Sequence, residues 1–349
     1  MNTDPFISIL ISSYNHEKYI YSCLKSILNQ EYTNFEVLIR DDGSTDETKK
    51  IINNFFNLPE SNKLKKHIFF GENIGYVASL NFLLKKASGS IIFLCGSDDV
   101  FFPRRIKKTI DYYKLFPNIP LIACNAEVIS DDGNCIRSSF YNFGDDNYEG
   151  LRRHINLKYS SALGLSLGGF GISFKIELLK PHFYQLPETL LFEDGYLSFL
   201  AGINKGALLI KEPLMLYRRS IESVSRVHLS LNYSEIVENE IKFLVLIKSL
   251  ILSKIIFLSG ERYNQYTSNL LNKNKSLKYL NQKLEILNLK LYFLRTNKIS
   301  WKNLLKLIHS TFPYGTITSE LPKIIFYSLF KFRMNKYLIR QYIKRSKVL

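Results

Sequence analysis

The first hundred residues alternate short apolar runs with segments whose apolar side chains recur at helical spacing. The apolar runs are rich in β-branched and aromatic residues, which favours strands. Strands that alternate with helices of this length form parallel βαβ units with right-handed crossovers. The pattern therefore predicts an α/β fold in which a mostly parallel sheet is flanked by helices. The predicted strands are Phe6–Ser12, Phe35–Arg40, His67–Phe70 and Ile91–Cys95, and the predicted helices are Glu17–Asn29, one ending near Phe56, one closing at Ser88-Gly89 and one from Pro103 to about Leu115.

The pattern becomes less regular beyond residue 120, and it changes again after Arg226, where Leu, Ile, Lys, Asn and Tyr recur in helical periods with few Gly. We therefore expect an α/β domain over residues 1–226 and a mainly α-helical, basic region over residues 227–349. The further predicted elements are a strand over Leu121–Ile129, a turn over Asp131-Asp132-Gly133-Asn134 into Cys135–Phe140, a helix over Tyr196–Ala201 that stops at Gly202, and two short strands, Ala207–Ile210 and Leu214–Tyr217.

Two of the first four predicted strands end on paired aspartates. Asp41-Asp42 follows Phe35–Arg40, and Asp98-Asp99 follows Ile91–Cys95. Open α/β sheets bind their ligands at the carboxyl ends of the strands, and hard cations prefer carboxylate oxygens. Each pair alone is equally well explained as a solvated turn, but two pairs on neighbouring strands predict one shared cleft for a divalent cation and a phosphorylated or sugar ligand.

Of three other polar clusters, the first has one interpretation and the other two have two each. Ser44 or Thr45 is predicted to cap the helix that ends near Phe56. Glu193-Asp194 opens a predicted helix, so these carboxylates either complement the helix dipole or supply a general base. Tyr217-Arg218-Arg219 is either an exposed basic strand end or a cationic clamp on a diphosphate.

The basic residues are concentrated near the C-terminus. Residues 230–349 hold sixteen Lys and five Arg against six Glu and no Asp, so they carry +15 of the formal net charge of +16. Such a region suggests an anionic partner surface, either phospholipid headgroups or nucleic acid. Amphipathic segments such as Ile241–Leu258 would lie in a membrane interface or, alternatively, pack on one another with their Lys side chains solvated.

Several protein classes find no support in the sequence. It contains no G-x-x-x-x-G-K-[ST], G-x-G-x-x-G or H-E-x-x-H motif, which argues against P-loop, dinucleotide-binding and zincin sites. The four Cys lack metal-type spacing and are expected to be reduced thiols of a cytosolic protein. The N-terminus has no basic signal-peptide region, and no apolar run reaches the ~20 residues that span a bilayer. We therefore expect a cytoplasmic protein.

Five segments, in this order, resemble the inverting nucleotide-sugar glycosyltransferases of family 2, which have the GT-A fold. Together they cover roughly residues 6–226, and their order is highly specific for the fold and less so for the substrate. The segments are Ile7–Thr48 (with SSYN and RDDGSTDET), Gly71–Asn81 (GENIGYVASLN), Ala87–Ile106 (with GSDDVFFP), Phe192–Gly202 (FEDGYLSFLAG) and Leu216–Ser225 (LYRRSIESVS).

The resemblance implies how a nucleotide-sugar donor is bound. Ser13 and Tyr14 would contact the nucleobase, with Tyr14 stacking on it. Asp42 would hydrogen-bond the base or the ribose edge, and Asp98 would contact ribose or metal.

The resemblance also assigns the reaction chemistry. Asp99, with Asp98, would coordinate Mg²⁺ or Mn²⁺ bridging the donor diphosphate; Asp194 would be the catalytic base; and Arg218 would help the diphosphate leave. Departure of a nucleoside diphosphate builds negative charge that a bound cation stabilises as a Lewis acid. A base on the opposite face lets an acceptor hydroxyl attack in line, so the anomeric centre inverts.

Three positions depart from the family pattern. Gly96 stands where the first Asp of Asp-x-Asp is often found, which bears on metal use. Leu80 occupies a position where many members have Arg, which puts one phosphate contact in doubt. Ser220 occupies a position often held by His.

We therefore expect a cytoplasmic glycosyltransferase of bacterial type that extends a surface glycan or a lipid-linked glycan. We also expect it to contact an anionic membrane surface at the inner face of the cell membrane. One alternative is a non-catalytic module that binds nucleotide-sugars or glycans and has a degenerate metal motif. A second is a nucleic-acid binder that uses the basic region, which the Asp-rich cleft argues against.

Overall fold

The computed structural model describes residues 4–141, 151–154, 167, 171–182, 184–188, 190–219, 245, 248–259 and 273–296. Residues 1–226 and 249–280 form one compact unit, and residues 227–248 and 281–349 form a second. The α/β core and every predicted site residue lie in the first unit. The basic region expected after residue 226 lies largely outside the described residues and stays a prediction.

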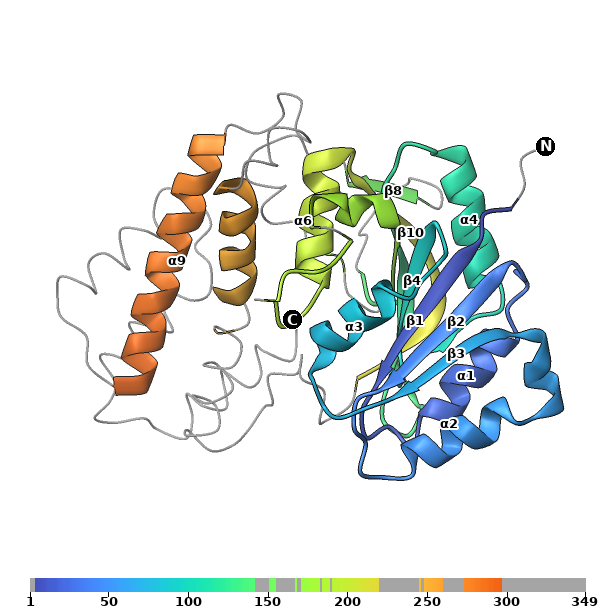
Figure 1. The fold of residues 1–349 in the computed structure, drawn as a ribbon. Coiled ribbons are helices and arrows are strands. Elements are labelled where there is room, and N and C mark those ends of the chain that lie inside the picture. Colours follow the sequence, from blue (N-terminus) through green and yellow to red (C-terminus); the bar gives the residue numbers. More distant parts are fainter. Residues whose placement is uncertain are drawn as a thin grey trace. The chain divides into compact units, whose positions relative to one another are not determined.

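The described strands form a mixed sheet in the order β3-β2-β1-β4-β9-β6-β10-β5, with β7 beside β6 and β8 beside β10 (Figure 1). The first four strands are parallel, as the alternating pattern predicted. β9 runs antiparallel between β4 and β6, so the sheet is mixed beyond β4. The strands are β1 (Ile7–Ser13), β2 (Phe35–Asp41), β3 (Lys65–Phe70), β4 (Ile91–Gly96), β5 (Val100–Phe101), β6 (Leu121–Ile129), β7 (Cys135–Arg137), β8 (Leu151–His154), β9 (Ile172–Lys175) and β10 (Ala207–Arg218).

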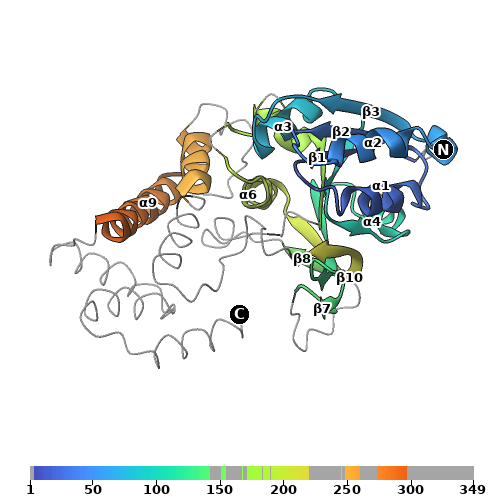
Figure 2. The ribbon, with the colours of Figure 1, turned by 90° about the horizontal axis from the view of Figure 1, so that it is seen from below.

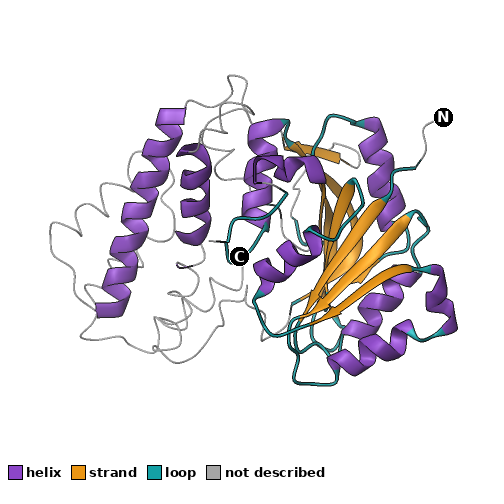
Figure 3. Ribbon diagram, viewed as in Figure 1, coloured by secondary structure: helices purple, strands orange, loops and turns teal. Residues whose placement is uncertain are grey.

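Helices cover both faces of the sheet (Figure 3). Side chains of α1, α2 and α4 share one buried apolar cluster with the strands, including Ile27, Phe55 and Ile110. α3 lies on the opposite side of the sheet from α1 and α4 (Figure 2). Both faces of the central strands are therefore buried, which explains why β1, β2 and β4 are continuous apolar runs. The helices are α1 (Ile20–Leu28), α2 (Thr48–Phe56), α3 (Tyr76–Leu84), α4 (Arg105–Leu115), α6 (Asp194–Asn204) and α9 (Lys273–Thr296), with 3₁₀ segments η1 (Pro59–Lys63) and η3 (Ile176–His182).

The structure corrects several sequence predictions. Ala207–Ile210 and Leu214–Tyr217 belong to one strand, β10, which passes Pro213 through irregularities in its pairing with β6. α6 continues through Gly202 to Asn204, and α3 ends at Leu84 before the predicted Ser88-Gly89. In β10 and α6, pairing and packing outweigh a local Pro or Gly signal.

The predicted cap of α2 is also wrong. Glu47, which makes no side-chain capping bond, precedes the first helical residue, Thr48. The Ser44 hydroxyl instead donates to Asp41, and Asp46 accepts the N–H of Thr48 at 3.0 Å. The polar residues after β2 therefore form a folded loop of their own before the helix begins.

Residues 249–259 are helical and belong to the first unit. Phe257 packs edge-on against Phe199 of α6, with 5.8 Å between ring centroids, and Leu258 is fully buried. The apolar side of this part of the predicted amphipathic segment Ile241–Leu258 therefore contacts protein. Among the helices that the structure describes, none is long and apolar enough to cross a membrane.

Candidate active site

The carboxyl ends of β1, β2 and β4 lie next to one another because these strands are in parallel register. Ser13 pairs with Asp41 across β1 and β2, and Ser12 pairs with Gly96 across β1 and β4. Residues that follow these strands therefore emerge at one edge of the sheet, where α/β folds bind ligands. Ser13 is buried there, and its Oγ has no hydrogen-bond partner among the described residues.

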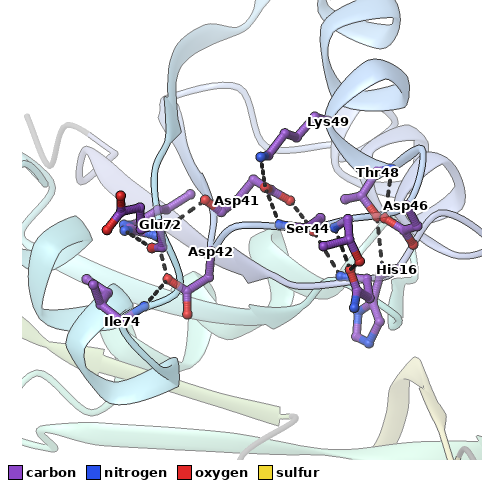
Figure 4. Close-up of polar contacts among 12 residues, drawn as sticks. His16, Asp41, Asp42, Ser44, Asp46, Thr48, Lys49, Glu72 and Ile74 are labelled. Atoms are coloured by element: carbon purple, nitrogen blue, oxygen red, sulfur yellow. Dashed lines mark hydrogen bonds and ion pairs between the residues drawn. The ribbon is translucent and has the colours of Figure 1, made fainter.

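Asp42 is buried and anchors the loop that precedes α3. Its Oδ1 accepts Nη1 of Arg40 at 2.7 Å and the N–H of Ile74 at 2.9 Å, and its Oδ2 accepts the N–H of Gly75 at 2.9 Å (Figure 4). Arg40 lies within β2, two residues before Asp42, and Asp42 follows directly after the strand ends at Asp41. Asp42 also donates its own N–H to the carbonyl of Ser13 at 2.8 Å. The carboxylate is thus held in place by an ion pair and two amides.

Asp41 makes its hydrogen bonds within the turn after β2. Asp42, by contrast, bonds to the loop before α3. Its Oδ1 accepts the N–H of Ser44 at 3.0 Å, and Nζ of Lys49 lies 3.9 Å away (Figure 4). Gly43, in the same turn, has φ +81°, and a Cβ at this position would lie 2.8 Å from the amide nitrogen of Asn73. Glycine therefore allows the turn after β2 to touch the loop before α3.

Asp98 and Asp99 follow β4 in a tight turn. The N–H of Asp99 donates to the carbonyl of Gly96 at 3.1 Å, and Asp99 Oδ1 accepts the N–H of Arg218 at 2.9 Å. Burial, followed by the charge of Asp98, raises the pKa of Asp99 well above its ordinary value. A Cβ on Gly96 would lie 2.7 Å from Asp99 Oδ2 and 2.9 Å from Asp98 Oδ1. The two carboxylates thus occupy the space that a side chain at position 96 would take.

The donor set of this turn fits a divalent cation. A buried carboxylate with a raised pKa beside a second carboxylate would be stabilised by a cation that relieves their repulsion. No group of three or more His, Cys, Asp or Glu among the described residues is arranged to hold a metal ion. A cation held by Asp98 and Asp99 would therefore need further ligands from a diphosphate and water.

Arg218 ties the turn after β4 to the turn after β6. Its Nε donates to the carbonyl of Asp98 at 3.1 Å, and its Nη1 donates to the carbonyls of Ser130 and Asp131 at 2.8 and 2.9 Å. The guanidinium carbon lies 4.6 Å from the ring centroid of Tyr19. The side chain is buried, so its charge lies beside the aspartate turn in a fixed orientation.

The loop after β1 contributes one predicted and one unpredicted residue. Tyr14 keeps 46% of its surface exposed, so its ring is available to a ligand. Nδ1 of His16 lies 2.6 Å from Oγ of Ser97, and the N–H of His16 donates to Oγ1 of Thr48 at 2.9 Å (Figure 4). His16 thus contacts the aspartate turn from the neighbouring strand, a contact that no local sequence signal indicates.

Glu193 and Asp194 lie at the start of α6, and their environments differ. Glu193 is buried, and burial together with the charge of Asp194 raises its pKa to about 7, although a hydrogen bond with Tyr76 opposes the rise. Asp194 is half-buried and accepts the N–H of Gly195 at 2.6 Å. Burial of the Tyr76 hydroxyl, followed by the negative charges of Glu193, Asp194 and Asp99, raises the pKa of Tyr76. Tyr76 therefore lies within electrostatic range of both the α6 carboxylates and the aspartate turn.

The fold resembles that of GT-A glycosyltransferases. The chain resembles the solved structure of a mannosyltransferase from Pyrobaculum calidifontis in complex with GDP-Man and Mn²⁺, with a TM-score of 0.54, 17% identity and coverage of 94% of this chain and 87% of that one. At this identity the likeness shows the fold.

The sequence comparisons name the family. Residues 8–176 match the model described as glycosyl transferase family 2, and this part of the chain belongs to that family. An uncharacterized glycosyltransferase of Haemophilus influenzae is 33% identical over 148 residues, which are 42% of this chain and 44% of that protein. Chondroitin synthase of Escherichia coli is 32% identical over 136 residues, which are 39% of this chain and 19% of that protein. The matches span less than half the length of these relatives.

Proposed function

We propose that this protein transfers a sugar from a nucleotide-diphosphate donor to a hydroxyl of a glycan or lipid-linked glycan, with inversion at the anomeric carbon. The single observation that carries the proposal is the position of Tyr76. The negative charges of Glu193, Asp194 and Asp99 raise the pKa of its hydroxyl, and the N–H of the preceding residue, Gly75, donates a hydrogen bond to Asp42. This proximity supports one site that combines the carboxylates after β2 and β4 with those at the start of α6. Such a site would have both a donor-binding end and a general base.

The nucleoside half of the donor is proposed to bind over β1 and β2. The exposed ring of Tyr14 would stack on the base, and Oγ of Ser13 would hydrogen-bond it. Asp42 would accept a hydrogen bond from the base or ribose with the lone pairs that its internal partners leave open. Because Arg40 and two amides already fix this carboxylate, binding would cost little reorganisation.

The diphosphate is proposed to lie against the turn after β4. Asp98 and Asp99 would hold Mg²⁺ or Mn²⁺, which when bound would stabilise charge on the leaving diphosphate. Arg218 would add a fixed positive charge at the same turn, since its guanidinium is bonded to the carbonyl of Asp98. Its bonds to the Ser130 and Asp131 carbonyls would also keep the turn in shape.

Asp194 is proposed to accept the proton of the acceptor hydroxyl. It is half-buried, whereas Glu193 is buried and holds its proton up to a pH of about 7. A protonated Glu193 cannot accept a further proton, so the partly exposed Asp194 is the better placed of the two to act as the base.

The proposal is tested by thermal shift and turnover. UDP-, GDP- and dTDP-sugars with and without Mn²⁺ should include a donor that raises the melting temperature, because a ligand stabilises only the state that binds it. Asp194→Asn should keep this shift and lose sugar transfer to an acceptor glycan. Transfer that is unchanged in Asp194→Asn would refute the base assignment, and donor binding without any turnover in the wild type would favour a non-catalytic binding module.

The acceptor and its location are a separate part of the proposal. The charge of residues 230–349 favours an acceptor presented at an anionic surface, where each Lys or Arg near the leaflet contributes about 1 kcal/mol. Sedimentation with vesicles that contain anionic lipid, against vesicles of neutral lipid alone, would measure this contribution. Equal binding to both vesicles would argue for a soluble glycan acceptor.

A further inference from the structure

The segment before α3 is fixed at one end by Asp42. The N–H of Ile74 and the N–H of Gly75 both donate to the Asp42 carboxylate at 2.9 Å, and Oδ1 of Asn73 lies 3.1 Å from the same Gly75 nitrogen. Gly75 has φ +88° and immediately precedes the first residue of α3, Tyr76. The backbone that carries Tyr76 is therefore positioned by the carboxylate proposed to bind the nucleoside.

Tyr76 reaches from this segment to the start of α6. Its ring lies 6.2 Å from the ring of Phe192, centroid to centroid, and its hydroxyl is hydrogen-bonded to Glu193. The whole residue keeps 38% of its surface exposed, while its hydroxyl end is buried against the carboxylates. Tyr76 thus touches both residues that precede Asp194 in the chain.

From these contacts we infer that Tyr76 is a positioning residue for the proposed reaction: its hydroxyl fixes Glu193 and thereby holds Asp194 toward the acceptor, and the Asp42–Gly75 bond couples this arrangement to donor binding. This inference rests on the proposed function. The phenol is the donor in the hydrogen bond and Glu193 is the acceptor, because the raised pKa of Tyr76 keeps the hydroxyl protonated. No proton transfer to or from substrate is assigned to Tyr76.

The Tyr76 hydroxyl affects both the orientation and the protonation of Glu193. Glu193 is buried at the beginning of a helix, and among the described residues the charge of Asp194 and the hydrogen bond from the neutral Tyr76 hydroxyl act on its pKa. Without the phenol hydroxyl the Glu193 carboxyl would lose a donor that stabilises its ionised form. It would then hold its proton to higher pH and lose the contact that sets its rotamer.

Tyr76→Phe removes the hydroxyl and keeps the ring. We expect kcat for sugar transfer to fall about tenfold, the loss expected for one hydrogen bond to a charged group, with the donor KM changed less than about twofold. Tyr21→Phe is the matched control, because Tyr21 is 48% exposed and its ring packs edge-on against Phe55, with 5.7 Å between ring centroids. This control should keep wild-type kcat and KM.

A second readout does not depend on turnover. In protein labelled with ¹³C at the Glu carboxyls, the resonance of Glu193 is identified by its loss in Glu193→Gln, and its titration midpoint should move to higher pH in Tyr76→Phe. An unchanged midpoint overturns the inference whether or not the wild type transfers sugar. Wild-type turnover with an unaltered kcat in Tyr76→Phe also overturns it, and a loss seen only in Tyr76→Leu would assign the ring, and not the hydroxyl, to ligand contact.

Discussion

The carboxylate of Asp42 and the backbone N–H of Gly75 are 2.9 Å apart, and this hydrogen bond joins the end of β2 to the start of α3. Asp42 also forms an ion pair with the buried Arg40. This ion pair at the edge of the sheet therefore fixes the loop that leads to Tyr76. Asp42 is thus both the proposed nucleoside-binding residue and a structural anchor of the loop. Substitutions at this residue should affect stability and donor binding together.

Asp42→Asn is expected to destabilise the protein by about 3 kcal/mol, because it leaves Arg40 as a buried, unpaired charge. The Arg40 and Asp42 side chains are only 7% and 4% exposed, and their atoms are 2.7 Å apart. Urea unfolding measures the change. Glu47→Gln is the control, since the 2.6 Å pair of Glu47 with Lys50 is exposed and its loss should leave the free energy of unfolding nearly unchanged. Equal effects of the two variants would show that burial does not matter here.

Gly96→Ala is expected to weaken cation binding about tenfold, or about 1.4 kcal/mol. The new Cβ would lie within 3 Å of carboxylate oxygens of both Asp98 and Asp99, so these side chains must rotate away from each other. Titration of Mn²⁺ in the presence of a nucleoside diphosphate, followed by melting temperature, measures the change. The melting temperature without ligand should stay close to that of the wild type, because carboxylates are the groups displaced. Undiminished Mn²⁺ stabilisation would place the cation elsewhere.

Glu36 should make stability fall in acid. Burial alone would raise its pKa, but hydrogen bonds from Ser8, Ser88 and Lys65 outweigh burial and lower the pKa to about 2. A depressed pKa in the folded state contributes stability above the unfolded value near 4.5, and this contribution is lost as pH falls toward 2. Urea unfolding of wild type and Glu36→Gln at several pH values from 6 to 3 tests this. The gap between them should narrow below about pH 4.5; a constant gap would contradict the assignment.

Glu193 should have the opposite pH dependence. Its folded pKa of about 7 lies above the unfolded value, so its contribution to stability is present below about pH 4.5 and is lost as pH rises through 7. Relative to Glu193→Gln, the wild type should therefore become less stable between these limits. The same variant should remove any inflection near pH 7 from the profile of kcat/KM against pH. An inflection that persists in Glu193→Gln belongs to another group.

Much of the fold could be predicted from local pattern. β1, β2 and β4 are apolar runs because both of their faces are buried, and such runs can be recognised from the sequence alone. β9 was not predicted, because Ile172–Lys175 is only four residues long and its role depends on the gap between β4 and β6. The joining of two short predicted strands into β10 likewise depends on pairing with β6, which no local window contains.

The carboxylates of the candidate site could be predicted from the sequence. The residues that contact and position them were harder to predict. Arg40 could have been found because it ends the predicted strand two residues before Asp42. His16 and Tyr76 could not, since their contacts with Ser97 and Glu193 join segments 81 and 117 positions apart in the chain. The roles of Ser13, Tyr14, Asp98, Asp99, Asp194 and Arg218 stay predictions.

By itself the sequence determined the alternation of strands and helices and the aspartates that end β2 and β4, because hydrophobic period and chain order are local properties. Only the tertiary structure decided which aspartate faces the loop before α3, which one the N–H of Arg218 contacts, and why position 96 carries glycine. Those outcomes depend on the space between side chains from separate strands. That space is set by parallel register and burial, which exist only once the chain has folded.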